Sequence, residues 1–213
     1  MTKRASIKLL IDLWAVAYYV GHQNWLDLSI LKIVNMSLRY GNTDLSAFGY
    51  VTYGMLLSSR NEYKLAYEFG KLALKLNDKF NNKSLSCKVP NLFALRINPY
   101  NNHLKTNLDI FRTAYKGGLE CGDLVYIVWT IMFSIWTRFI IGQPLKEVYE
   151  ESCKYIAVMK QTNDLSMLYG LMSLQQTTLN LQGLTKDKYS FDDEIYSEAL
   201  CLQHWEKYEV LSC

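Results

Sequence analysis

Histidine and cysteine are the residue types in this chain best suited to metal binding or nucleophilic chemistry, and they lie far apart in the sequence. None of the three histidines, at positions 22, 103 and 204, has a second histidine within one helical turn. Cys201 and His204 are three residues apart, a spacing that would bring a thiolate to an imidazole or supply half of a metal site. A buried cysteine beside a surface histidine also explains this spacing and is the interpretation we favour. We therefore expect no metal site.

The acidic run Asp192-Asp193-Glu194 is a second candidate ligand cluster. Its carboxylates could bind a cation, but acidic side chains are also stabilised at a helix N-terminus by the helix dipole, and we favour this second role. The sequence has no phosphate-binding loop, no protein-kinase signature and no Gly-x-Ser-x-Gly motif. We therefore expect no catalytic residue, no cofactor and no enzymatic activity in this chain.

A helix-capping residue followed by leucine recurs four times and indicates a repeat. The pairs are Asp44-Leu45, Ser84-Leu85, Asp123-Leu124 and Asp164-Leu165, at spacings of 40, 39 and 41 residues. A period of about 40 residues is typical of helix pairs that stack because one pair cannot bury its apolar face. The sequence thus predicts an all-α, tetratricopeptide-like α-α superhelix of about five helix pairs in one domain, 1–213. The expected repeats are 5–41, 42–82, 83–122, 123–163 and 164–209.

Ten helices follow from the apolar periodicity and the positions of the breaks. They are expected at about 5–19, 23–40, 44–59, 62–79, 84–97, 103–121, 123–141, 144–162, 164–182 and 193–209. Pro90 interrupts the fifth, which should kink or start late because proline lacks a backbone donor and clashes with the preceding turn. The segment 98–102 is expected to be a loop.

Small residues recur where helices of such repeats cross at short distance. Gly54, Ala66 and Ala73 have the spacings of 12 and 7 residues that the tetratricopeptide pattern requires. A glycine inside a helix costs about 1 kcal/mol relative to alanine, which suggests a packing reason for keeping it. Ala114, Gly118 and Gly170 are expected to have the same packing role.

Aromatic residues are abundant, with 16 tyrosines, 8 phenylalanines and 5 tryptophans, and they are the candidate binding residues. Repeat proteins bind partners in a concave groove lined by their first helices, where aromatic side chains act as anchors. The residues that the register directs to this groove are Phe48, Val51 and Met55, with Trp129 or Trp136 as further candidates. Core packing is the alternative for each of them. We expect a protein partner, or a second copy of the chain.

Lysines 64, 71, 75 and 79 line one face of a predicted second helix. We interpret this row as a solvated convex surface, and we expect no nucleic-acid binding. The net charge of +3 is unevenly spread, because residues 1–120 carry 16 basic and 8 acidic side chains and residues 121–213 carry 7 and 12. The halves therefore have net charges of +8 and −5. This asymmetry could steer an acidic partner to one end, although chance variation on a solubilising surface is the alternative.

The apolar stretch 124–136 is the one segment that suggests a membrane span. Asp123 and Arg138 bracket 14 residues, about 21 Å of helix against the roughly 30 Å of a bilayer core, so we expect no span. The five cysteines are an odd number at wide spacings with no Cys-x-x-Cys, which indicates a reducing compartment. A cytoplasmic protein is expected.

Three strings of residues resemble the helical region of large bacterial signal-transduction ATPases and multi-sensor kinases. They are Lys32-Ile33-Val34-Asn35-Met36-Ser37-Leu38 with Tyr40-Gly41-Asn42, then Tyr50-Val51-Thr52-Tyr53-Gly54-Met55, and Gly118-Leu119-Glu120-Cys121-Gly122-Asp123. The likeness extends from about Ile7 to Leu200.

This resemblance implies a tetratricopeptide-like region that follows an AAA-type ATPase module, often with a serine/threonine kinase domain before it and GAF and histidine-kinase domains after it. None of the family's catalytic residues has a matching position here. We therefore expect a non-catalytic interaction and regulatory scaffold, either a segment of a multidomain sensor or a freestanding relative. The alternative is a sensor that binds a small ligand or peptide in the superhelical groove.

Overall fold

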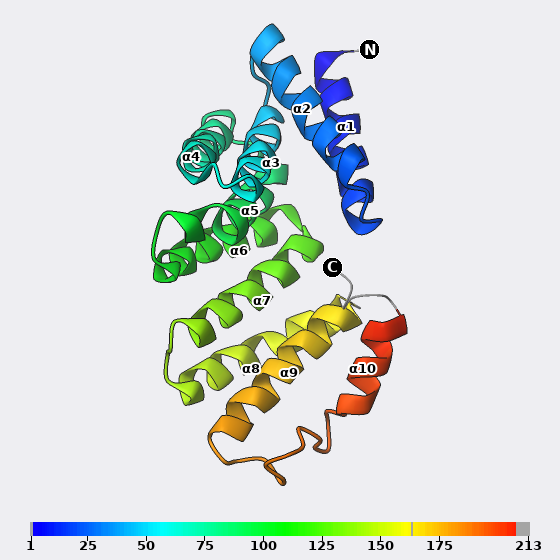
Figure 1. Cartoon of the computed structure of the whole chain (residues 1–213), viewed down its shortest axis with the longest axis vertical. Coiled ribbons are helices and arrows are strands. Elements are labelled where there is room, and N and C mark those ends of the chain that lie inside the picture. The colour runs from blue at the N-terminus through cyan, green and yellow to red at the C-terminus, as the bar shows by residue number, and fades with distance from the viewer. Residues whose placement is uncertain (1, 163, 208–213) are drawn as a thin grey trace. The chain divides into compact units, whose positions relative to one another are not determined.

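The computed structural model describes residues 2–162 and 164–207, and every named element in these ranges is helical (Figure 1). The α-helices are α1 (Lys3–Tyr19), α2 (Gln23–Tyr40), α3 (Ser46–Ser59), α4 (Tyr63–Phe80), α5 (Lys88–Arg96), α6 (Asn107–Cys121), α7 (Leu124–Ile140), α8 (Leu145–Gln161), α9 (Leu165–Leu181) and α10 (Glu198–Lys207). Short 3-10 helices η1 (Lys83–Leu85), η2 (Asn98–Tyr100) and η3 (Leu104–Thr106) flank α5 and precede α6. The predicted all-α class is confirmed.

The chain divides into two compact units, residues 1–127 and residues 128–213, with the boundary inside α7. In the first unit α1 packs on α2, α3 on α4 and α5 on α6, and α3 also contacts α2 and α5. In the second unit α9 packs on α8 and α10. The helical hairpin is therefore the packing element in both units.

The recurring polar-leucine pairs mark the starts of hairpins, but only two of the four polar residues act as predicted. The Asp164 carboxylate accepts a hydrogen bond from the Met167 backbone N–H at 3.1 Å and caps α9, and Asp123 accepts one from the Tyr126 N–H at 3.3 Å. The capping role predicted for Asp44 and Ser84 is wrong. Asp44 binds Arg4 instead of capping α3, and Ser84 lies inside η1.

Helix bounds differ from the predictions mainly at three N-termini. The fifth helix starts late, at Lys88, with Pro90 in its first turn, as the proline predicted. The sixth begins with η3 and continues as α6, and the tenth begins at Glu198. Position 208 and those after it lie outside the described residues, as do Met1 and Asn163.

The core of the first unit is centred on α3, which is buried on nearly all sides. Its only glycine near the middle, Gly54, faces α5 and α4: an added Cβ would lie 2.7 Å from the Cδ1 of Ile97 and 3.0 Å from the carbonyl oxygen of Ala66. Ala66 and Ala73 on α4 are fully buried. Small side chains thus let α4 and α5 approach α3 closely.

No helix within the described part of the chain combines the length and apolarity needed to cross a bilayer.

Candidate binding cleft

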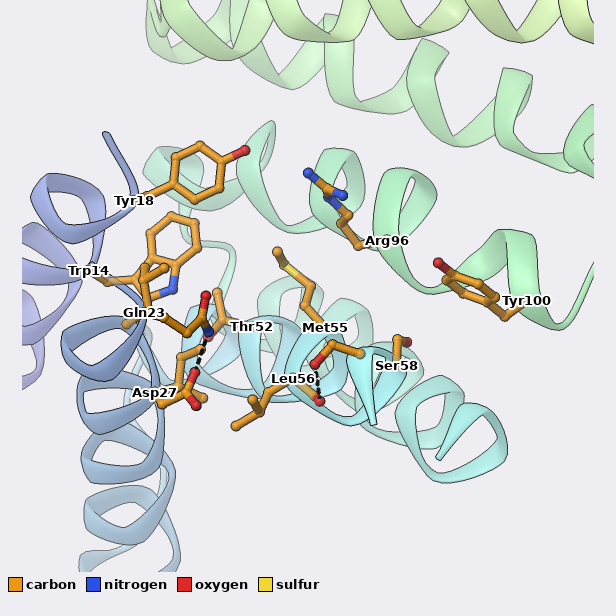
Figure 2. A pocket seen from close by; sticks show the side chains of 13 residues that line it. Trp14, Tyr18, Gln23, Asp27, Thr52, Met55, Leu56, Ser58, Arg96 and Tyr100 are labelled. Carbon is orange, nitrogen blue, oxygen red and sulfur yellow. Dashed lines mark hydrogen bonds between the residues drawn. The ribbon is translucent and has the colours of Figure 1, made fainter. Parts of the chain in front are cut away.

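A cleft of about 250 Å³ opens in the first unit, among side chains from α1, α2, α3, α5 and η2 (Figure 2). Its walls are largely apolar, and charged and aromatic groups surround the opening. The lining residues are Trp14, Tyr18, Gln23, Leu26, Asp27, Ile30, Thr52, Met55, Leu56, Ser58, Ser59, Arg96 and Tyr100.

The apolar wall is held rigidly by aromatic packing. Trp14 is only 4% exposed, and its ring lies edge-on to Phe48 at 5.1 Å and stacks with Tyr18 at 5.4 Å, centroid to centroid. Leu26 and Ile30 from α2 are buried beside it. Because these contacts fix the indole, little side-chain freedom would be lost when a ligand packs on this wall.

The carboxylate and two of the hydroxyls of the cleft are already engaged within the protein. The Asp27 carboxylate accepts a hydrogen bond of 2.7 Å from the Gln23 amide and lies 3.8 Å from the Arg60 guanidinium. Thr52 donates to the Phe48 carbonyl and Ser59 to the Leu56 carbonyl, both at 2.8 Å. The buried Ser58 hydroxyl is different, since it has no hydrogen-bond partner among the described residues.

Arg96 is the charged group of the cleft that remains available. It is exposed at the C-terminal end of α5 and makes no hydrogen bond or ion pair with the residues that the structure describes. Its guanidinium extends over Met55 toward the side of the cleft that holds Tyr18 (Figure 2). Tyr100 borders the same space, with its ring stacked on Tyr63 at a centroid distance of 4.7 Å.

This arrangement is suited to binding. A guanidinium pairs with carboxylates or phosphates through a planar fork of N–H donors, and the apolar wall beside it can cover an aliphatic or aromatic group. A concave, mostly apolar surface with a few well-placed polar groups is the usual form of a ligand site. The cleft can therefore hold a group that is apolar at one end and anionic at the other.

The predicted groove residues fall in different places. Met55 lines the cleft, but Phe48 and Val51 are 2% and 0% exposed and belong to the core, because α1, α2, α4 and α5 enclose α3. Their positions agree with the packing alternative. In the second unit Trp129 is half-buried, and Trp136 is partly exposed beside a separate cavity of about 220 Å³.

The remaining predicted small residues lie at helix contacts. Ala114 on α6 is fully buried, and a Cβ added to Gly118 would lie 2.5 Å from the Cγ1 of Ile127. A Cβ added to Gly170 would lie 2.9 Å from the methyl carbon of Met132.

Cys201 and His204 do not form a pair. The His204 Nε2 lies 3.0 Å from the Ser166 hydroxyl, whereas the buried Cys201 thiol lies 3.7 Å from the hydroxyl of Ser173. Within the described ranges no group of three or more histidine, cysteine or acidic side chains is arranged to hold a metal ion.

The acidic run binds backbone N–H groups of the segment before α10, which begins at Glu198 and not at 193 as predicted, so only Asp192 reaches the helix N-terminus. Asp192 accepts from the Glu198 N–H at 2.7 Å, and Asp193 accepts from the N–H groups of Ile195 and Tyr196 at 2.7 Å. Burial by itself would raise the pKa of Asp193, but these hydrogen bonds outweigh it and hold the pKa below its ordinary value. The run therefore orders the chain that leads into α10.

Comparison with known proteins links the chain to signal transduction. It is 29% identical over 168 residues, 78% of its length, to a segment of "Hybrid signal transduction histidine kinase G" of Dictyostelium discoideum. The chain spans only 5% of the length of that kinase. No family model matches the chain, and no solved structure matches it either.

Proposed function

We propose that this chain is a non-catalytic interaction and regulatory module of a histidine-kinase signalling system. The observation that carries the proposal is its similarity to a small segment of a hybrid histidine kinase. A segment of this size within a much longer signalling protein is suited to connecting or regulating other domains. The expected family is bacterial whereas this relative is from Dictyostelium discoideum, so the proposal concerns the signalling class and not a bacterial origin.

In this proposal the helical hairpins stack in chain order as a tetratricopeptide-like superhelix in the cytoplasm. The stack couples an input signal to a kinase or ATPase domain in the same polypeptide or the same complex. Support comes from the hairpin packing within each unit and from the cleft, where rigid aromatic walls and an arginine are the side chains that most often dominate binding energy at protein interfaces.

Photo-cross-linking in cells tests this function. A photoreactive phenylalanine analogue replaces Tyr100, which is 56% exposed at the cleft, and a control chain carries it at Lys64 on α4, outside the cleft. We expect the Tyr100 position to capture a protein with a histidine-kinase or response-regulator domain, and the purified chain to change its phosphotransfer rate. Capture of the same proteins from both positions, an unchanged rate, or ATP turnover by the chain itself would contradict the proposal.

A small-ligand sensor is the second candidate, favoured by the Ser58 hydroxyl, which is buried in the cleft and has no hydrogen-bond partner in the part of the chain that the structure describes. A ligand oxygen or N–H could satisfy this group and shift the packing of α3. Ligand-dependent melting of the purified chain distinguishes the two functions, because a ligand that binds only the folded state raises the melting temperature with no partner present. A shift with a metabolite extract and no captured protein would favour the sensor.

A further inference from the structure

We infer that the cleft of the first unit recognises an acidic amphipathic segment of a protein partner, with a large apolar side chain against Trp14 and Met55 and a carboxylate on Arg96. The inference rests on the proposed function and specifies the chemistry of the partner.

The ion-pair pattern of the first unit shows that Arg96 can accept a partner from outside the chain. Three of its five arginines pair with a carboxylate of the chain: Arg4 with Asp44, Arg60 with Asp27 and Arg112 with Asp109. Arg39 and Arg96 have no such partner among the described residues, and of these two Arg96 lines the cleft, together with Asp27. Since Asp27 is engaged by Gln23 and Arg60, it does not neutralise Arg96, and the guanidinium can pair with an incoming carboxylate.

The size and the apolar wall of the cleft favour a side chain of a peptide over a whole cofactor. Its volume of about 250 Å³ is below the roughly 300–1,000 Å³ of pockets that hold drug-sized ligands. Trp14, Leu26 and Ile30 are buried within the chain, whereas Met55 is half-buried and reaches into the opening. One leucine or phenylalanine side chain can cover Met55 and complete this apolar surface.

Charge complementarity selects an acidic partner over a neutral or basic one. Residues 1–120 carry 16 basic and 8 acidic side chains, so the helices that form the cleft belong to a segment with a net charge of +8. Such a surface attracts acidic segments and speeds their association, and it repels basic ones. The exposed position of Arg96 places one of these charges at the opening of the cleft.

The test uses the full chain and short fluorescein-labelled peptides in which leucine or phenylalanine is followed, one to four positions later, by glutamate. Matched peptides carry glutamine or lysine in place of that glutamate, and fluorescence anisotropy gives each Kd. We expect the tightest glutamate peptide to bind about 10-fold better than its glutamine counterpart, as for the loss of one charged hydrogen bond, and the lysine peptide to bind most weakly.

Three variants locate the effect. Arg96→Gln should remove the preference for glutamate, and Arg96→Glu should reverse it in favour of the lysine peptide. Lys64→Gln, which removes one positive charge from α4 outside the cleft, should keep the glutamate preference. Thermal unfolding of each variant should match the parent, because Arg96 and Lys64 are exposed and make no contact that the fold requires.

Equal binding of glutamate and glutamine peptides, an unchanged preference in Arg96→Gln, or no binding by any peptide would overturn the inference. Tighter binding of the lysine peptide than of the glutamate peptide by the parent chain would also overturn the inference. These outcomes leave the proposed function standing if the cross-linker at Tyr100 still captures a kinase. If no kinase is captured but the chain still prefers the glutamate peptide, the kinase role is overturned and the site for an acidic segment is kept.

Discussion

At the scale of single residues, two helical glycines differ in what an added side chain would meet: rigid backbone at one position and a flexible side chain at the other. A Cβ added to Gly117 on α6 would lie 2.6 Å from the Ser86 carbonyl oxygen and 2.8 Å from its carbonyl carbon, which are backbone atoms. A Cβ added to Gly170 on α9 would meet only the end of the Met132 side chain, with the terminal methyl at 2.9 Å and the sulfur at 3.8 Å. The Ser86 backbone cannot move away without disturbing the start of α5, whereas the end of the Met132 side chain can rotate.

We predict that Gly117→Ala destabilises the chain and that Gly170→Ala does not. Overpacking against backbone should cost about 1–3 kcal/mol at position 117, more than the gain of about 1 kcal/mol in helix propensity. At position 170 the propensity gain should dominate. Urea unfolding of the two variants measures the difference, and equal shifts would contradict the close approach of α6 to Ser86.

A pH-dependent contribution to stability is predicted for Asp44. Both carboxylate oxygens bind Arg4, at 2.8 and 2.9 Å, and these hydrogen bonds lower the pKa of Asp44 below its ordinary value. A lowered pKa in the folded state means that the stabilisation is complete above the unfolded value of about 3.9 and is lost as the pH falls through the folded value.

The comparison of the parent with Asp44→Asn measures this contribution. The difference in urea midpoint should be constant near neutral pH and should shrink as the pH falls below about 4. Asp109→Asn is the control, because Asp109 is 81% exposed and its Arg112 partner is one turn away, so its effect should be small throughout. A parent-to-Asp44→Asn difference that persists unchanged in acid would refute the assignment.

At the scale of elements, Asp164 caps its helix as predicted and Ser84 does not, so alanine variants of these two residues form a matched pair. Asp164→Ala removes the hydrogen bond to the Met167 N–H and should cost about 1 kcal/mol of stability. Ser84→Ala should cost much less, since η1 is capped by the Asn82 side chain, which accepts from the Ser84 N–H at 3.0 Å. Equal losses on urea unfolding would show that sequence position, and not the observed geometry, decides the capping.

The helices could be predicted from the sequence because apolar periodicity and breaks are local signals. The late start of α5 followed in the same way from Pro90. Less local features could not be predicted. The buried Asn98 amide, in the segment expected to be a loop, donates to the Asn107 side-chain oxygen at 2.6 Å and so joins η2 to the start of α6.

The cleft itself is the clearest example of a non-local feature. Trp14, Met55 and Arg96 come from three helices that are each about 40 residues apart in the sequence. Only the packing of the hairpins brings them to one opening. Met55 was accessible to prediction because the repeat register places it on the exposed side of a first helix, but nothing around Arg96 distinguishes it from any other basic residue near a helix end.

At the scale of the whole molecule, the proposed superhelical stack predicts a result for solution scattering. A compact globule of this length has a radius of gyration of about 17 Å. Five hairpins stacked in chain order form an elongated particle, so small-angle X-ray scattering should give a value several ångströms larger at concentrations where the chain is monomeric. A radius near that of the compact globule would contradict the stack.

The proposed role of the chain in signalling is tested most directly with a histidine kinase cross-linked at the Tyr100 position. Its autophosphorylation rate is measured while the purified parent chain, or the Arg96→Gln variant, is added over a range of concentrations. We expect a saturating change in the autophosphorylation rate with the parent chain, and about 10-fold more protein should be needed for the same change with Arg96→Gln. An autophosphorylation rate that neither protein changes, or that both proteins change equally at the same concentration, would contradict the proposed role.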